Sequence, residues 1–339
     1  MIDKSKKLTI IYFLCVFITL LSTLPLIFSL LDNDYYWNLY VWFYFIIILV
    51  YVWYRFILLA YGYYRGDLYS VNYSDPYTVI IPCYNEDPVL LEKCIQSVLH
   101  ATGDKKIIVI DDGSKNDTIS VINNFVKKYS NIKAYAFKDN KGKRKALFEA
   151  FKRIETKFTI TIDSDTLVEK NAFVYLLGPF IDKNIGATTG NIRLMNEKKN
   201  LLTRVVAGLY LCGLDNYKKA QSVFGNVICC SGCLSAYRTE LVKEISKEFL
   251  EQKFLGSLAK HSEDRHLTNL VLEKGYKVVY VERSLCYTET PDTLIKFLRQ
   301  QQRWKRGFVR ESIYLLSFSW SRSKLLFIEA TLGTTIPFF

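Results

Sequence analysis

The stretch Phe158-Thr-Ile-Thr-Ile-Asp163-Ser-Asp165-Thr decides the fold that we expect for this chain. Its β-branched residues, 159–162, predict a short buried strand that ends in two carboxylates. Because side chains alternate along a strand, Asp163 and Asp165 should project to the same side where the strand ends. Two hard oxygen ligands at the carboxyl edge of a sheet suit Mg²⁺ or Mn²⁺, with substrate phosphates completing the coordination. The alternative is a polar strand end, or a cap for a helix from Glu169 onward.

Short strands and helices alternate before this stretch. Strands are predicted at 77–81, where the first stops at Pro82, and at 106–110 and 132–137. Helices are predicted from Pro88, with Asp87 as the cap, at 118–129 and from Lys143. Repeated βα units of this kind predict an α/β fold with a mostly parallel sheet and ligand sites at the carboxyl ends of its strands.

Polar clusters follow several of these strands, and each has two interpretations. The segment 83–87 would hold a nucleoside, or would simply form a turn and a helix cap. The segment 111–114, Asp-Asp-Gly-Ser, offers carboxylates to ribose or base hydroxyls, although Asp-Gly is also a common turn. The cationic segment 140–146 starts a helix, where the macrodipole disfavours positive charge, so it favours a bound phosphate over an ordinary solvated face.

Three further clusters lie in the second half of the chain. Glu263 and Asp264 begin an amphipathic helix, as partners of its dipole or with one of them as a general base. His266 is interpreted as a residue that packs or supports the site from behind rather than as a metal ligand. The C-x-x-C of 230–233 lacks the second pair that a zinc site needs, so we expect a glycine-containing loop. The segment 297–308 is a basic helix with aromatic members, which would lie under a membrane, contact a substrate, or both.

The first 65 residues are predicted to be a membrane module. Residues 8–31 and 35–54 carry no charge, and positive residues flank the pair on both outer sides. This pattern predicts a multi-pass protein of the plasma membrane, with its amino terminus and everything after Arg65 in the cytoplasm. The net charge of +12 suits a protein that works on a membrane surface or on anionic substrates. The basic residues are expected beside the membrane rather than on an exposed stripe, which argues against nucleic-acid binding. The eight cysteines are spread along the chain and are expected to be reduced thiols.

The order of these clusters resembles the processive family 2 inverting glycosyltransferases of the GT-A type, a group that includes cellulose, chitin and hyaluronan synthases. The series is Asp112, Asp163-x-Asp165, Glu263-Asp264 and Gln300-x-x-Arg303-Trp304. Within the group the chain most resembles the bacterial-type hyaluronan synthases. The segments that carry this resemblance are 80–87, 142–144, 200–204, 230–232, 264–269, 299–304 and 308–312.

The resemblance implies a role for each cluster. The residues that would bind UDP are Tyr84, Glu86, Asp112, Lys143, Asp163 and Arg303. Asp165 would hold Mn²⁺ or Mg²⁺ against the diphosphate, and Asp264 would be the general base that deprotonates the acceptor hydroxyl. The growing polysaccharide acceptor would contact Ser231, Gly232, Gln300 and Trp304.

The implied activity is the polymerisation of UDP-GlcNAc and UDP-GlcA into hyaluronan by a membrane-embedded enzyme. The alternatives are a chitin-type synthase that uses UDP-GlcNAc alone, a non-processive lipid glycosyltransferase, and a nucleotide-sugar sensor or inactive subunit. The expected organisation is two transmembrane helices in 1–65, a GT-A domain in 66–290, interface helices in 291–320 and the start of a truncated transmembrane segment in 321–339. One departure from the family pattern is Cys233, where the acceptor loop usually has proline.

Overall fold

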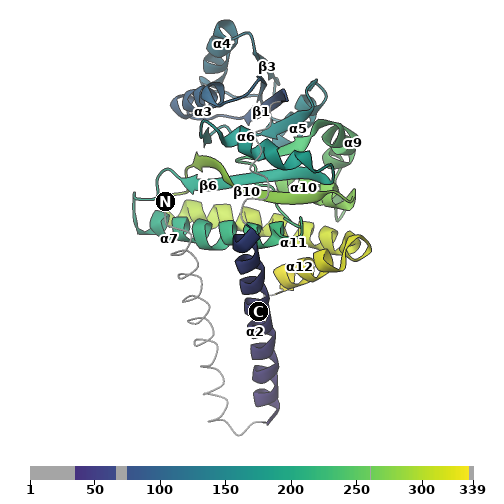
Figure 1. The fold of residues 1–339 in the computed structure, drawn as a ribbon. Coiled ribbons are helices and arrows are strands. Elements are labelled where there is room, and N and C mark those ends of the chain that lie inside the picture. The colour runs from purple at the N-terminus through teal and green to yellow at the C-terminus, as the bar shows by residue number, and fades with distance from the viewer. Residues whose placement is uncertain (1–34, 66–74, 260, 336–339) are drawn as a thin grey trace. The chain divides into compact units, whose positions relative to one another are not determined.

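The computed structural model describes residues 35–65, 75–259 and 261–335, which fall into two compact units (Figure 1). One unit is Met1–Gly66 with Thr331–Phe339, and the other, the sheet unit, is Asp67–Ala330. The first contains helix α2 (Tyr35–Arg65), in which Val41–Ala60 is long and apolar enough to cross a membrane, with a hydropathy of 2.1. This segment overlaps the second predicted span, whereas the first, 8–31, lies outside the described residues.

The sheet unit is built on a mixed sheet whose strand order, within the described residues, is β3-β2-β1-β4-β7-β6-β10-β5. The first four of these strands run parallel, as do β6 and β10. Strand β7 lies antiparallel between β4 and β6, and the short β5 is antiparallel to β10. The prediction of an α/β fold with a mostly parallel sheet is therefore confirmed. The strands are β1 (Tyr77–Cys83), β2 (Lys105–Asp111), β3 (Ile132–Ala136), β4 (Phe158–Thr161), β5 (Leu167–Val168), β6 (Ile185–Leu194), β7 (Ser235–Arg238) and β10 (Lys277–Thr288).

Two hydrophobic clusters cover the two faces of the sheet. Alternate residues of one strand divide between them: Val79 and Ile81 belong to one cluster and Ile80 to the other. Helices α3 (Pro88–His100), α4 (Thr118–Lys128) and α6 (Ala172–Leu177) pack on the first face. The second face is covered by α5 (Lys143–Phe151), α9 (Thr239–Leu250), α10 (Glu263–Glu273) and α11 (Leu294–Arg322).

The remaining elements are short. A two-stranded hairpin, β8 (Lys253–Phe254) and β9 (Ser257–Leu258), connects α9 to α10. The chain also forms α7 (Leu201–Leu209), a π-helical turn η2 (Tyr210–Asp215), α8 (Asn216–Ser222), a 3-10 turn η1 (Gly178–Ile181) and α12 (Lys324–Thr335).

The strand register aligns the carboxyl ends that carry the polar clusters. Cys83 pairs with Asp111, and Ile80 pairs with Thr161, so β1, β2 and β4 end at one edge of the sheet. The prediction that Pro82 stops this strand after residue 81 was wrong, because β1 continues two residues further, to Cys83. Proline cannot donate a hydrogen bond, but Cys83 still accepts one through its carbonyl oxygen, from the amide of Asp112 at 2.9 Å.

Candidate active site

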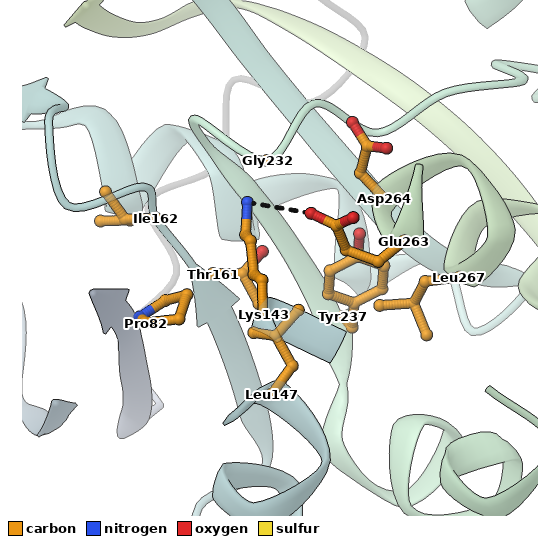
Figure 2. A pocket seen from close by; sticks show the side chains of 10 residues that line it. All are labelled: Pro82, Lys143, Leu147, Thr161, Ile162, Gly232, Tyr237, Glu263, Asp264 and Leu267. Carbon is orange, nitrogen blue, oxygen red and sulfur yellow. Dashed lines mark ion pairs between the residues drawn. The ribbon is translucent and has the colours of Figure 1, made fainter. Parts of the chain in front are cut away.

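Lys143 is the centre of the candidate site (Figure 2). It is the first residue of α5, and its Nζ donates to Oδ1 of Asp163, which follows β4. The same Nζ lies 3.3 Å from Oε1 of Glu263, the first residue of α10. Lys143 therefore bridges the carboxylates of Asp163 and Glu263. The two carboxylates meet at the edge of the sheet where the parallel strands end.

The loop around Gly232 lies directly on this ion pair. A Cβ added to Gly232 would be 2.8 Å from Nζ of Lys143 and 3.1 Å from both carboxylate oxygens of Asp163, so only glycine fits without displacing them. Cys233 is also close, with its thiol donating to Oδ2 of Asp163 at 3.6 Å. The predicted glycine-containing loop is thus in contact with the carboxylates.

Asp165 lies close to other acidic side chains. Its carboxyl is near those of Asp163 and Glu86, and Glu86 is fixed by a hydrogen bond of 2.6 Å from Ser164 Oγ to Oε2. Burial, with the added effect of these two carboxylates, raises the pKa of Asp165 to about 6. The segment after β1 and the segment after β4 therefore belong to one acidic cluster.

This acidic cluster fits a divalent cation only with help from a substrate. Among the residues that the structure describes, no group of three or more His, Cys, Asp or Glu side chains is placed to hold a metal ion. Mg²⁺ characteristically binds one or two protein carboxylates together with substrate phosphates and water. The carboxylates of Asp163 and Asp165 match that chemistry, with the remaining ligands coming from a diphosphate.

Asp112 anchors the loop that leads into α5. Its two carboxylate oxygens accept hydrogen bonds from the amides of Lys141, at 2.7 Å, and Gly142, at 2.8 Å. Burial raises the pKa of Asp112, although these backbone bonds oppose the change. Because Gly142 immediately precedes Lys143, Asp112 positions the lysine of the site. Tyr84, by contrast, is 46% exposed.

The cationic cluster at the start of α5 divides in the structure. Arg144 turns away from the site and is 7% exposed, with its guanidinium donating to the carbonyl of Phe249 and to Oε1 of Gln252. Lys145 pairs with Glu149 along the helix at 3.1 Å. Of these three cations, Lys143 contacts the acidic cluster, and the predicted phosphate contact at this helix start stays a prediction. Successive helical residues point about 100° apart, so adjacent cations cannot share one direction.

Asp264 follows Glu263 at the start of α10 and lines the same small pocket as Lys143, Gly232 and Tyr237 (Figure 2). Its Oδ1 accepts from the amide of Arg265 at 2.8 Å. Burial, and then the neighbouring carboxylate of Glu263, raises the pKa of Asp264 to about 6 while Lys143 opposes the change. A carboxylate with a pKa near neutral is suited to accept a proton during a reaction.

The hydroxyl of Ser231 accepts a hydrogen bond from a lysine that the sequence analysis did not identify. Lys218 of α8 is 6% exposed and donates to Ser231 Oγ at 2.5 Å. The amide of Ser231 donates to Oγ1 of Thr189 on β6 at 3.1 Å. Nothing in the sequence around Lys218 distinguishes it from a surface lysine, so its contact with the loop could be found only from the fold.

Gln300, Arg303 and Trp304 lie on α11, and Arg303 and Trp304 are exposed. In the described part of the chain, no hydrogen bond or ion pair joins Arg303 to the acidic cluster. The backbone of α11 does reach the site one turn later. Gly307 packs so closely on Ser262, the residue before α10, that a Cβ on Gly307 would overlap Ser262 Oγ. Gly307 thus brings α11 into contact with the start of α10, where Glu263 and Asp264 lie.

Glu311, a fully buried residue of α11, was also missed from the sequence. It accepts from Gln252 Nε2 at 2.9 Å and from Arg310 Nε at 2.8 Å, and its Oε2 lies 3.1 Å from Nδ1 of His266. Burial alone would raise the pKa of Glu311, but the bonds from His266, Arg310 and Gln252 bring it below its usual value. His266 also stacks on Phe249, which confirms its interpretation as a packing residue.

Comparison with known proteins identifies the family. Residues 75–307 match the model described as glycosyltransferase like family 2. An N-acetylglucosaminyltransferase of Neorhizobium galegae is 32% identical over 255 residues, which cover 74% of this chain and 59% of that protein. A hyaluronan synthase of Streptococcus pyogenes is 38% identical over 240 residues, 69% of this chain and 57% of that protein. The chain therefore spans less than two thirds of the length of these relatives.

Solved structures share the fold at low identity. A mannosyltransferase of Pyrobaculum calidifontis, in complex with GDP-Man and Mn²⁺, matches with a TM-score of 0.58 and 16% identity, over 85% of this chain and 83% of that one. Residues 1–349 of S. aureus TarS, in complex with UDP-GlcNAc, match with a TM-score of 0.52 and 16% identity, over 76% and 73% of the two chains. The fold is that of GT-A enzymes, and the chain is a member of glycosyltransferase family 2.

Proposed function

We propose that this glycosyltransferase transfers N-acetylglucosamine from UDP-GlcNAc, in alternation with glucuronic acid from UDP-GlcA, and thereby builds hyaluronan. The observation that supports this most is the bridge from Lys143 to Asp163 and Glu263, beside Asp264. It places a cation suited to a diphosphate next to a carboxylate suited to a proton transfer. The relatives named above include both a hyaluronan synthase and an N-acetylglucosaminyltransferase.

On the donor side, Lys143 and the acidic cluster would hold UDP. Tyr84, Glu86 and Asp112 lie on the segments after β1 and β2, where the uridine of a nucleotide would be bound. Lys143 would donate a hydrogen bond to a diphosphate oxygen in place of, or beside, its hydrogen bond to Asp163. Both are charge-assisted hydrogen bonds. Arg303 would complete this positive environment if α11 turns its side chain toward the leaving group.

On the acceptor side, Asp264 would be the general base. As the acceptor hydroxyl attacks the anomeric carbon, its proton would pass to the Asp264 carboxylate, while the bond from that carbon to the UDP oxygen breaks. A single displacement of this kind inverts the anomeric configuration. Ser231, Gly232, Gln300 and Trp304 would contact the acceptor, and the exposed ring of Trp304 offers a face for a sugar.

A divalent cation, Mn²⁺ or Mg²⁺, would be held by Asp165 and the diphosphate. When bound, it would neutralise the charge that develops on the leaving UDP. The raised pKa of Asp165 supports this proposal, because a cation relieves the repulsion among the carboxylates of Asp163, Asp165 and Glu86.

A membrane setting completes the proposal. We place the enzyme in the plasma membrane as a multi-pass protein with its catalytic unit and amino terminus in the cytoplasm, where UDP-sugars are present. The apolar length of Val41–Ala60 supports one span. The segment 291–320 would lie at the membrane interface, because α11 exposes apolar residues such as Leu294, Ile295 and Trp320.

A chitin-type synthase that uses UDP-GlcNAc alone is the second candidate, and it is favoured by the N-acetylglucosaminyltransferase among the relatives. The test is UDP release by the full chain in detergent with Mn²⁺ and each donor singly or together. We expect sustained release only with both donors, and a product that hyaluronidase digests. Sustained release with UDP-GlcNAc alone, giving a product that chitinase digests, would replace the hyaluronan proposal with the second candidate.

A further inference from the structure

Gln252 links the segments that carry the two sides of the candidate active site. It follows α9 and precedes the β8–β9 hairpin, and its side chain is half-buried. Its Oε1 accepts a hydrogen bond from the guanidinium of Arg144 at 2.9 Å, and its Nε2 donates to Oε1 of Glu311 at 2.9 Å. The side chain therefore reaches α5 in one direction and α11 in the other.

The chemistry of these two partners requires an amide at position 252. A guanidinium only donates hydrogen bonds, and an ionised carboxylate only accepts them. Burial acts to raise the pKa of Glu311, but its hydrogen-bonded partners bring the pKa below its usual value, so this carboxyl is ionised. The glutamine amide has an acceptor and a donor side by side and satisfies both partners. A carboxylate or an ammonium at the same position would satisfy one of them and repel the other.

In one direction, the hydrogen bonds of Gln252 lead to the donor side of the site. Arg144 follows Lys143, the first residue of α5 and the lysine that contacts Asp163. The guanidinium of Arg144 also donates to the carbonyl of Phe249, near the end of α9. Gln252 and Phe249 together fix the first turn of α5, and with it the backbone that carries Lys143.

In the other direction, the hydrogen bonds lead through α11 to the proposed general base on α10. Oε2 of Glu311 lies 3.1 Å from Nδ1 of His266, which comes two residues after Asp264. Asn269, in the next turn of α10, donates to the backbone carbonyl of Glu311 at 3.0 Å. The first turns of α10 are therefore held against α11 at Glu311, and Gln252 orients the carboxylate that makes one of these contacts.

We propose that Gln252 is a positioning residue for glycosyl transfer, which holds Lys143 and Asp264 in place through its two separate hydrogen bonds. This inference rests on the function proposed above for the catalytic site. Each hydrogen bond serves a different property of the enzyme. The bond from Arg144 supports donor binding through Lys143, and the bond to Glu311 supports turnover through Asp264.

Two substitutions separate the two hydrogen bonds. Gln252→Glu keeps an acceptor for Arg144 but places a carboxylate beside Glu311, whereas Gln252→Lys keeps a donor for Glu311 but places an ammonium beside Arg144. Calorimetric UDP binding and kcat at saturating donor are measured for the full chain in detergent, at a temperature where every variant is folded. We expect Gln252→Glu to lower kcat about 3- to 10-fold while UDP affinity stays near that of the parent. Gln252→Lys should weaken UDP binding by a similar factor while kcat stays near that of the parent.

A rescue variant and a control distinguish positioning from a general loss of stability. Combining Gln252→Glu with Glu311→Gln restores an amide–carboxylate pair in reverse order, and should return kcat toward the parent value. Glu251→Gln exchanges a carboxylate for an amide at the exposed neighbouring position, and should alter neither kcat nor UDP binding.

The proposal is overturned if Gln252→Glu and Gln252→Lys change kcat and UDP affinity in the same way, if both leave them unchanged, or if the exchanged pair does not restore kcat. All variants are compared on the donors that the parent uses. A parent that releases UDP from UDP-GlcNAc alone would therefore contradict the hyaluronan proposal without affecting this one.

Discussion

Gly307 of α11 lies directly against Ser262, the residue that precedes α10 and the two carboxylates that begin it. A Cβ on Gly307 would overlap both Oγ and Cβ of Ser262. Ser262 itself has a left-handed backbone, with φ of 62°. This contact fixes the start of α10, and with it Glu263 and Asp264, against the helix that carries Arg303 and Trp304.

We expect Gly307→Ala to lower the free energy of unfolding by ~1–3 kcal/mol, as overpacking does, and to slow UDP release by displacing Asp264. The second substitution Ser262→Gly should restore both properties, because it removes the overlapping atoms and suits the left-handed backbone. Thermal unfolding and UDP release of the single and double variants measure this. Equal stability of the parent and Gly307→Ala would show that the contact is not tight.

Gly232→Ala should affect activity far more than stability. The atoms that its Cβ would meet, Nζ of Lys143 and the Asp163 carboxylate, are the ends of side chains that can move. The matched control is Gly208→Ala in α7, where a Cβ meets nothing within 4 Å and should stabilise the helix by about 0.5–1 kcal/mol. UDP affinity and turnover are measured for both variants. Normal UDP binding by Gly232→Ala would contradict the prediction that a Cβ at position 232 displaces Lys143 and Asp163.

Lys143→Met should weaken UDP binding by about tenfold or more, since a charge-assisted hydrogen bond is worth ~1.5–3 kcal/mol. It should also raise the pKa of Asp264 further, because Lys143 is the cation that opposes that rise. Lys145→Met is the matched control, because Lys145 pairs with Glu149 of its own helix. Calorimetric titration with UDP compares the two, and an equal loss in both would remove Lys143 from the donor site.

The pH dependence of transfer should report Asp264. A base must be deprotonated to act, and its pKa is about 6, so kcat/KM should rise as the pH increases through about 6 and then level off. Asp165 has a similar raised pKa, and a bound cation would lower it. At saturating Mn²⁺ the rise of kcat/KM near pH 6 should therefore persist, because it reports Asp264 rather than Asp165. A rate that stays constant between pH 5 and 8 would exclude Asp264 as the base.

Local sequence patterns predicted much of the sheet unit. Asp87 accepts from the amides of Val89 and Leu90, as its predicted capping function requires, and α3 begins at Pro88. The clusters after β1, β2 and β4 meet at one edge because parallel strands bring their carboxyl ends together. These features depend on residues close in the chain, so the sequence pattern contains the information for them.

Contacts between distant segments could not be predicted in this way. The antiparallel β7 enters between β4 and β6, and no local pattern specifies the pairing of a four-residue strand. Glu311 contacts Gln252, 59 positions away in the chain, and His266, 45 positions away. The close approach of Gly307 to Ser262 likewise depends on how two helices pack rather than on the sequence around either residue.

Asp264→Asn tests the central claim most directly. The amide keeps the size of the carboxylate but cannot accept the acceptor's proton, and general-base catalysis is worth about 10²–10⁴-fold in rate. Turnover with both UDP-sugars and calorimetric UDP binding would be measured for the same preparation. We predict that transfer falls by at least about 100-fold while UDP affinity remains near that of the parent. Retained transfer would contradict the assignment of Asp264 as the base and, with it, the account of this site.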